Sequence, residues 1–139
     1  MQTGEGAIAS ATAQIGHTKY QTIVSSGGHN VIVDEPEVIE GGNTGMEPHG
    51  LLLGSLGSCT AITLRMYINR KMWPVDEITV NLELFKTETG VTIKRWLNFK
   101  GELSDIQRNR LLQIADACPI HKILTGSIHI ETGFGTPAV

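Results

Sequence analysis

Two cysteines, Cys59 and Cys118, are the residues of this sequence best suited to chemistry of their own. A cysteine acts as a nucleophile or metal ligand only as the thiolate, so its surroundings must lower its pKa. Cys118 stands directly before Pro119, a residue type preferred at the first position of a helix, and would lie at the positive end of a helix dipole. Cys59 would lack such a terminus inside a continuous helix and would need a nearby base or cation, for which His49 and Glu47 are candidates.

Cys59 lies in an apolar segment, residues 51–71, that we expect to form the helix around which the fold is built. No charged residue occurs from Leu51 through Leu64, and apolar residues fall on every face, which is typical of a buried helix. This uncharged run of fourteen residues is shorter than the roughly 20 that a bilayer requires, so we predict a core helix. Small residues at helical spacing favour close approach of another backbone: Gly50, Gly54, Gly57 or Ser58, and Ala61.

The rest of the pattern predicts an α+β fold with antiparallel sheets. Ser104 is a typical N-cap and predicts a helix over residues 105–117, with a short helical turn over 120–124. Residues 34–48 are rich in glycine, proline and acidic residues and predict a long loop, of a length that is often functional. Alternating or β-rich runs predict strands at 7–15, 20–25, 29–33, 78–85, 91–101 and 127–132.

Composition limits the classes of function. At 139 residues we expect one domain, residues 1–139. The net charge of −3 gives no electrostatic reason to expect nucleic acid or an anionic membrane as partner. The first residues lack a basic segment followed by an apolar run, so we expect a cytoplasmic protein. In a reducing compartment two cysteines are catalytic, redox-active or metal-binding more often than a structural disulfide, and two inert buried thiols are the alternative.

A metal site is the weaker interpretation of these residues. Cys59, Cys118, His121 and His49 are ligand types that zinc accepts. Only Cys118 and His121 are closely spaced, whereas structural zinc sites usually contain two such pairs. We therefore expect neither a metal nor another cofactor.

Several segments together resemble the OsmC/Ohr family of thiol peroxidases, and its OsmC-like branch most closely. They are the start of the apolar segment from Pro48, the run LGSCTAITLRMY, the distal ACPIH, the loop VDEPEVIEGGNTG and the strand entry WPVDEITVNL. The resemblance implies an OsmC-like fold, with antiparallel sheets around long buried central helices in an intertwined homodimer. It also implies a cytoplasmic enzyme of the oxidative stress response that reduces organic hydroperoxides.

The resemblance assigns a role to each cysteine. Cys59 would attack the hydroperoxide and become a sulfenic acid, and Cys118 would condense with it to a disulfide. A thiol or dithiol reductant would then restore both thiols.

The sequence departs from the family pattern at two supporting positions. The family uses a glutamate ten residues before the first cysteine, where this sequence has His49, and Glu47 lies two residues further away. It also uses an arginine from the N-terminal strands, where Lys19 or Gln21 is the nearest substitute. These departures favour a second hypothesis, a non-catalytic dimer whose thiols sense oxidants or which binds a small apolar ligand.

His49 is our third candidate catalytic residue. Ten residues of continuous helix would separate it from its own Cys59 by about 15 Å. We therefore expect His49 to act on Cys59 of the other subunit, or else simply to begin the helix at the surface.

Overall fold

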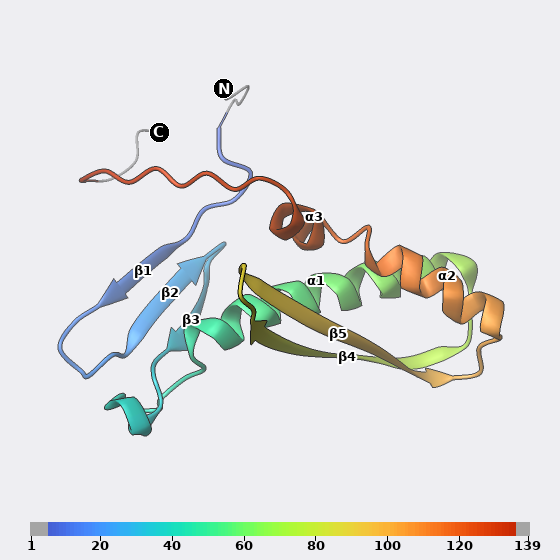
Figure 1. The fold of residues 1–139 in the computed structure, drawn as a ribbon, viewed down its shortest axis with the longest axis horizontal. Helices are drawn as coiled ribbons and strands as arrows, with labels where there is room; N and C mark the ends of the chain where they lie inside the picture. The colour runs from blue at the N-terminus through green and yellow to red at the C-terminus, as the bar shows by residue number, and fades with distance from the viewer. Residues whose placement is uncertain (1–5, 136–139) are drawn as a thin grey trace. The chain divides into compact units, whose positions relative to one another are not determined.

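The computed structural model describes residues 6–135 (Figure 1). The chain forms two compact units, one of residues up to 51 together with those from 130 onward, and one of residues 52–129. The long helix α1, Pro48–Lys71, begins in the first unit and continues through the second. The α+β class with antiparallel sheets and one long helix is confirmed. That the whole chain is a single domain stays a prediction.

The first unit holds a three-stranded antiparallel sheet in the order β1, Thr12–Ile15, β2, Thr22–Ser26, and β3, His29–Val33. Gly27 and Gly28 join β2 to β3 with φ of 59° and 82°. Both values lie in the left-handed region that a tight hairpin turn requires and that glycine adopts without strain. The hairpin is therefore confirmed, whereas the first strand is shorter than the predicted 7–15.

The loop after β3 is organised by a buried carboxylate. Asp34 accepts hydrogen bonds from the Thr44 hydroxyl at 2.6 Å and from the backbone N–H groups of Glu35, Gly42 and Thr44. The Thr44 hydroxyl is the main cause of the lowered pKa of Asp34, because it stabilises the charged form. A short 3-10 helix, Glu37–Ile39, lies within the loop. Residues 34–48 thus form an ordered connection that leads into α1.

The second unit contains the rest of α1, the hairpin of β4, Val75–Lys86, and β5, Val91–Gly101, and the helices α2, Asp105–Ala115, and α3, Pro119–Thr125. Side chains of β4 alternate between half-buried and exposed from Ile78 to Leu84, as predicted. Ser104 caps α2, and Gln107 completes a reciprocal capping box. The predicted strand at 127–132 is wrong, because an alternating sequence makes a ladder only beside a hydrogen-bonded neighbour, and these residues belong to no strand of the described chain.

The core of the second unit lies between α1, the start of β4 and α2. Tyr67 and Trp73 pack edge to face at 5.5 Å, and the Arg65 guanidinium donates to the carbonyl oxygens of Val75 and Asp76. These contacts fix the second half of α1 against the hairpin. The buried residues of this core are Leu64, Tyr67, Ile68, Val75, Leu111 and Ala115.

Only one face of α1 is buried in the single chain. Ile62 and Met66 are 56% and 65% exposed, so the prediction of burial on every side does not hold for one chain by itself. The small residues divide in the same way. A Cβ at Gly57 would come within 2.7 Å of Leu82 Cδ1, so the close approach of β4 explains why glycine stands there. A Cβ at Gly54 would meet no atom within 4 Å.

By length and composition α1 could also cross a membrane. Counting the uncharged run alone was therefore not enough to exclude a span. The core helix of a soluble protein passes the same test, and α1 contributes six buried residues to the described chain.

Candidate active site

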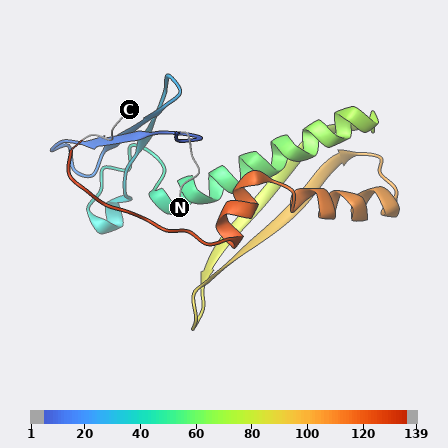
Figure 2. The ribbon, with the colours of Figure 1, turned by 90° about the horizontal axis from the view of Figure 1, so that it is seen from above.

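The fold brings the two cysteines close together. Cys59 lies near the middle of α1, and Cys118 immediately precedes α3, which lies beside the middle of α1 (Figure 2). Each thiol shifts the pKa of the other, so the two are neighbours, and both are free. Cys118 is fully buried, whereas Cys59 is half-buried. Of the pair, Cys59 is therefore the sulfur that a molecule from solvent can reach.

Cys118 is the N-cap of α3, as the sequence predicts. Its sulfur accepts a hydrogen bond from the His121 backbone N–H at 3.5 Å, and Pro119 occupies the first helical position. Proline suits this position because the first N–H groups of a helix have no partner within the helix. The sulfur thus takes the place of the serine or aspartate oxygen that usually caps a helix.

The surroundings shift the pKa values of the two thiols in opposite directions. Burial raises the pKa of Cys59, and the neighbouring Cys118 raises it further. Burial also raises the pKa of Cys118, but the hydrogen bonds to its sulfur outweigh burial and leave that pKa below its ordinary value. The neighbouring Cys59 thiol is the largest of these lowering causes, and the His121 backbone N–H donates to the sulfur at 3.5 Å. The surroundings therefore favour the thiolate of Cys118 more than that of Cys59.

A pocket of about 430 Å³ opens onto Cys59. It lies between α1 and the beginning of α3, and its wall is mainly apolar. An organic molecule with a small reactive group could enter there and meet the Cys59 sulfur. The lining residues are Ser55, Ser58, Cys59, Ile62, Thr63, Met66, Pro119 and Ile120.

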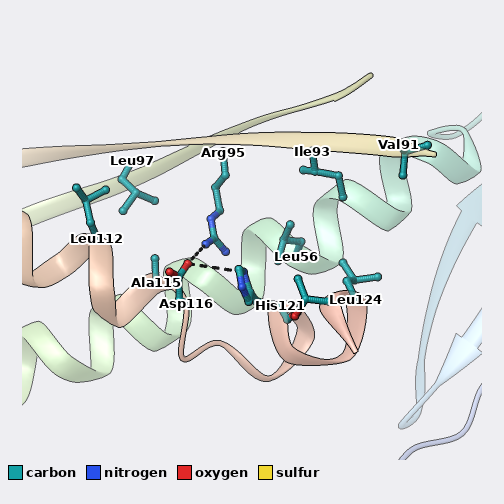
Figure 3. A pocket seen from close by; sticks show the side chains of 11 residues that line it. Leu56, Val91, Ile93, Arg95, Leu97, Leu112, Ala115, Asp116, His121 and Leu124 are labelled. Carbon is teal, nitrogen blue, oxygen red and sulfur yellow. Dashed lines mark hydrogen bonds and ion pairs between the residues drawn. The ribbon is translucent and has the colours of Figure 1, made fainter. Parts of the chain in front are cut away.

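A second pocket, of about 530 Å³, lies between β5, α1, the end of α2 and α3 (Figure 3). Leucine and isoleucine side chains form much of its wall, and Arg95 projects from β5 toward Asp116 and His121. Arg95 Nη2 donates to Asp116 Oδ1 at 2.8 Å, and Nη1 donates to Thr60 Oγ1 at 3.0 Å. Thr60 directly follows Cys59, so this ion pair reaches the immediate surroundings of the thiols.

Sequence reasoning missed Arg95 and Thr60. The alternation of β5 carries the signal that could have found the arginine, because Arg95 shares the half-buried register of Ile93 and Leu97. A charged residue in the inward register of a strand requires a partner. Thr60 gave no such signal within an apolar helix.

His49 is not brought to its own Cys59. It lies in the first turn of α1, exposed, with Nδ1 3.9 Å from Glu47 Oε1. Because α1 is continuous, helical rise separates the two positions by about 15 Å. Among residues 6–135 no group of three or more histidines, cysteines and carboxylates could hold a metal ion, so the zinc interpretation gains no support.

The family model for OsmC-like proteins matches residues 41–133, a range that includes both cysteines. The chain belongs to the OsmC-like family. None of the curated proteins matches it.

Solved structures share the OsmC-like fold over most of the chain. An OsmC-like protein from Mycoplasma pneumoniae has a TM-score of 0.74 at 18% identity and covers 86% of this chain and 89% of its own. An organic hydroperoxide resistance protein OsmC from Legionella pneumophila has a TM-score of 0.61 at 20% identity, covering 86% and 90%. The organic hydroperoxide resistance protein OhrB of Bacillus subtilis reaches 25% identity with a TM-score of 0.59, covering 86% and 92%.

Proposed function

We propose that this OsmC-like protein is a cysteine-based peroxidase that reduces organic hydroperoxides, with Cys59 as the attacking thiol and Cys118 as the resolving thiol. The observation that carries the proposal is that the two thiols are neighbours, with Cys59 at the wall of an apolar pocket and Cys118 buried. The mechanism requires that a peroxide can reach the Cys59 sulfur and that the Cys118 sulfur can then reach Cys59. The hydroperoxide resistance proteins among the structural neighbours support the same choice.

The neighbouring thiols provide a route for the proton in this proposal. The Cys59 sulfur attacks the terminal oxygen of the hydroperoxide and the O–O bond breaks. The Cys59 proton passes to the Cys118 thiolate and on to the departing alkoxide, which leaves as the alcohol. Cys59 is then a sulfenic acid and Cys118 is again a thiolate.

The second step closes the disulfide. The Cys118 sulfur attacks the Cys59 sulfur, the S–O bond breaks, and hydroxide leaves and takes a proton from solvent to become water. The two thiols have together supplied the two electrons that reduce the peroxide. A thiol or dithiol reductant returns both cysteines to their starting state, and we place this cycle in the cytoplasm.

One equivalent of an organic hydroperoxide should therefore convert the reduced protein to an intramolecular Cys59–Cys118 disulfide. Mass spectrometry of the digested protein should find the two cysteine peptides linked. The disulfide closes a loop of about 60 residues, which should stabilise the fold by up to about 4 kcal/mol in the chain-entropy model. Two free thiols after treatment, without sulfenate, would exclude the catalytic proposal.

A second candidate function follows from the raised pKa of Cys59. Burial and Cys118 favour the neutral Cys59 thiol, which reacts slowly with peroxide. A chain that oxidises once and slowly would be an oxidant sensor or a ligand-binding dimer instead of an enzyme. Many turnovers of hydroperoxide with excess dithiol reductant support the enzyme, and oxidation limited to one equivalent supports the sensor.

We also propose that the active form is a homodimer in which His49 serves Cys59 of the other subunit. The test is to mix Cys59→Ser chains with His49→Ala chains and refold them together. A mixed dimer pairs the intact Cys59 of one chain with the intact His49 of the other, so activity should rise well above either parent. Activity equal to the mean of the parents would show that His49 does not act across the interface.

A further inference from the structure

The pocket between β5, α1, α2 and α3 has no part in the proposed peroxidase cycle. Its volume of about 530 Å³ lies within the ~300–1,000 Å³ that is typical of small-molecule sites. All its lining residues belong to the second unit, and neither cysteine is among them. A wall of this kind favours a ligand with an aliphatic body. Its larger apolar residues are Leu56, Val91, Ile93, Leu97, Leu112 and Leu124.

An ion pair interrupts this apolar wall. Figure 3 shows Arg95 pointing toward Asp116 and His121, with apolar side chains on both sides of it. Arg95 Nη2 donates to Asp116 Oδ1 at 2.8 Å, so the two charges compensate each other. The side chain of Arg95 is only 12% exposed, and an ion brought beside it would lose much of its hydration. Charge complementarity therefore favours an uncharged ligand.

The ion pair leaves both a donor and an acceptor for a ligand. In the described chain two N–H groups of the Arg95 guanidinium donate, one to Thr60 and one to Asp116, and a guanidinium has further N–H groups. The Asp116 carboxylate meets Arg95 and His121 through Oδ1 alone, which leaves Oδ2 to accept. A hydroxyl group both donates and accepts, so an alcohol matches this pair.

We propose that this pocket is a binding site for a neutral aliphatic alcohol. The carbon chain lies against the leucine and isoleucine wall, and the hydroxyl donates to Asp116 Oδ2 and accepts from an Arg95 N–H. The site shares no lining residue with the pocket at Cys59. The inference does not rest on the proposed peroxidase function, because no step of it involves a thiol or a peroxide.

The competing occupant is a second copy of the chain. Leu56 is the residue of α1 that lines the pocket, and Ile62, which is 56% exposed, lies roughly 120° away from it around the helix. A second chain packed on Ile62 therefore approaches α1 from another side. A dimer that nevertheless covers the pocket would keep the alcohol out, and the binding test would show this.

Octan-1-ol, octanoate and octylammonium are the probes, because they share one chain length and differ in the charge of the head group. Each is titrated into the wild-type protein by calorimetry at pH 8, where a histidine is ordinarily uncharged. Octan-1-ol should bind about tenfold more tightly than either ion, since octanoate meets the like charge of Asp116 and octylammonium that of Arg95. No binding of octan-1-ol, or equal or tighter binding of an ion, would overturn the proposal.

Methyl NMR spectra locate the bound alcohol. Ile93, Leu112 and Leu124 line the proposed site, whereas Ile62 lines the pocket at Cys59. Octan-1-ol should shift the methyl signals of the first three residues and leave those of Ile62 unchanged. Shifts confined to Ile62 would place the alcohol beside the thiol and would also overturn the proposal.

Asp116→Asn and Glu102→Gln form a matched pair of variants, because each removes one negative charge. Asp116 lines the pocket, whereas Glu102 is exposed and does not. Asparagine keeps an oxygen that can accept from Arg95 but leaves the Arg95 charge uncompensated. Octanoate should therefore bind about tenfold more tightly to Asp116→Asn than to the wild type and become the strongest probe.

Glu102→Gln should keep the wild-type order of the three probes. An unchanged order in Asp116→Asn would show that the head group does not lie at the ion pair, and would overturn the proposed arrangement. Circular dichroism checks that each variant folds. The wild-type probe series and the methyl spectra still decide if Asp116→Asn does not fold.

Discussion

Cys59→Ser is expected to abolish hydroperoxide reduction, whereas Cys118→Ser should retain a single turnover. Serine at 59 has no sulfur to accept oxygen, and the buried Cys118 does not line the pocket through which peroxide would enter. Serine at 118 leaves the Cys59 sulfenic acid without a partner, so further peroxide should oxidise it to the sulfinic acid. Peroxide consumed per chain and the mass of the Cys59 peptide measure both outcomes.

The single turnover of Cys118→Ser should also be slow. The Cys118 sulfur accepts the Cys59 proton in the proposed first step, and loss of a positioned base typically costs about a hundredfold or more. Thermal unfolding of both variants serves as the control for folding. If Cys59→Ser keeps activity while Cys118→Ser resists over-oxidation, the two roles are reversed.

Gly54→Leu should dissociate the proposed homodimer. In one chain a Cβ at position 54 meets no atom within 4 Å, and Gly54 lies on the exposed face of α1 with Ile62 and Met66. A lone chain should therefore gain up to about 1 kcal/mol, because leucine is the better helix former. In a dimer packed through this face, the extra atoms should destabilise the interface by about 3 kcal/mol.

Gly54→Leu should stabilise a lone chain but destabilise a dimer, so the sign of the stability change decides between the two. Sedimentation and chemical unfolding at several protein concentrations give the dimer affinity and the stability of the chain. Gly54→Ala is the control, since it improves helix formation and adds only one carbon atom. A wild-type protein that sediments as a compact monomer at micromolar concentration would contradict the dimer, and so would a Gly54→Leu protein that is simply more stable.

The elements that the sequence predicted well are those with local signals. Ser104 and Cys118 cap helices through bonds to residues three positions later, and the alternation of β4 is visible within one strand. Residues 127–132 show where such signals fail, because a strand also needs a neighbour. The apolar residues of α1 predicted a helix, but composition could not tell which face one chain buries.

The site was less accessible to sequence reasoning. Periodicity within single elements cannot predict that Cys59 and Cys118, which are separated by a hairpin and a helix, lie close together. The pairing was predicted from the resemblance to a family. The position of Cys118 before Pro119 did predict that it stands at the beginning of a helix, because that signal is local. Arg95 approaches Thr60 through tertiary packing, and no neighbour in sequence marks that contact.

The sulfur of Cys118 caps α3 and would also be a reacting group in the proposed cycle. A thiolate accepts the His121 N–H more strongly than a neutral disulfide sulfur does, because charge strengthens a hydrogen bond. In the proposed cycle, each closure of the disulfide would withdraw a charged acceptor from the beginning of α3, and each reduction would return it. The redox state of the two cysteines would then determine how strongly the beginning of this short helix is held.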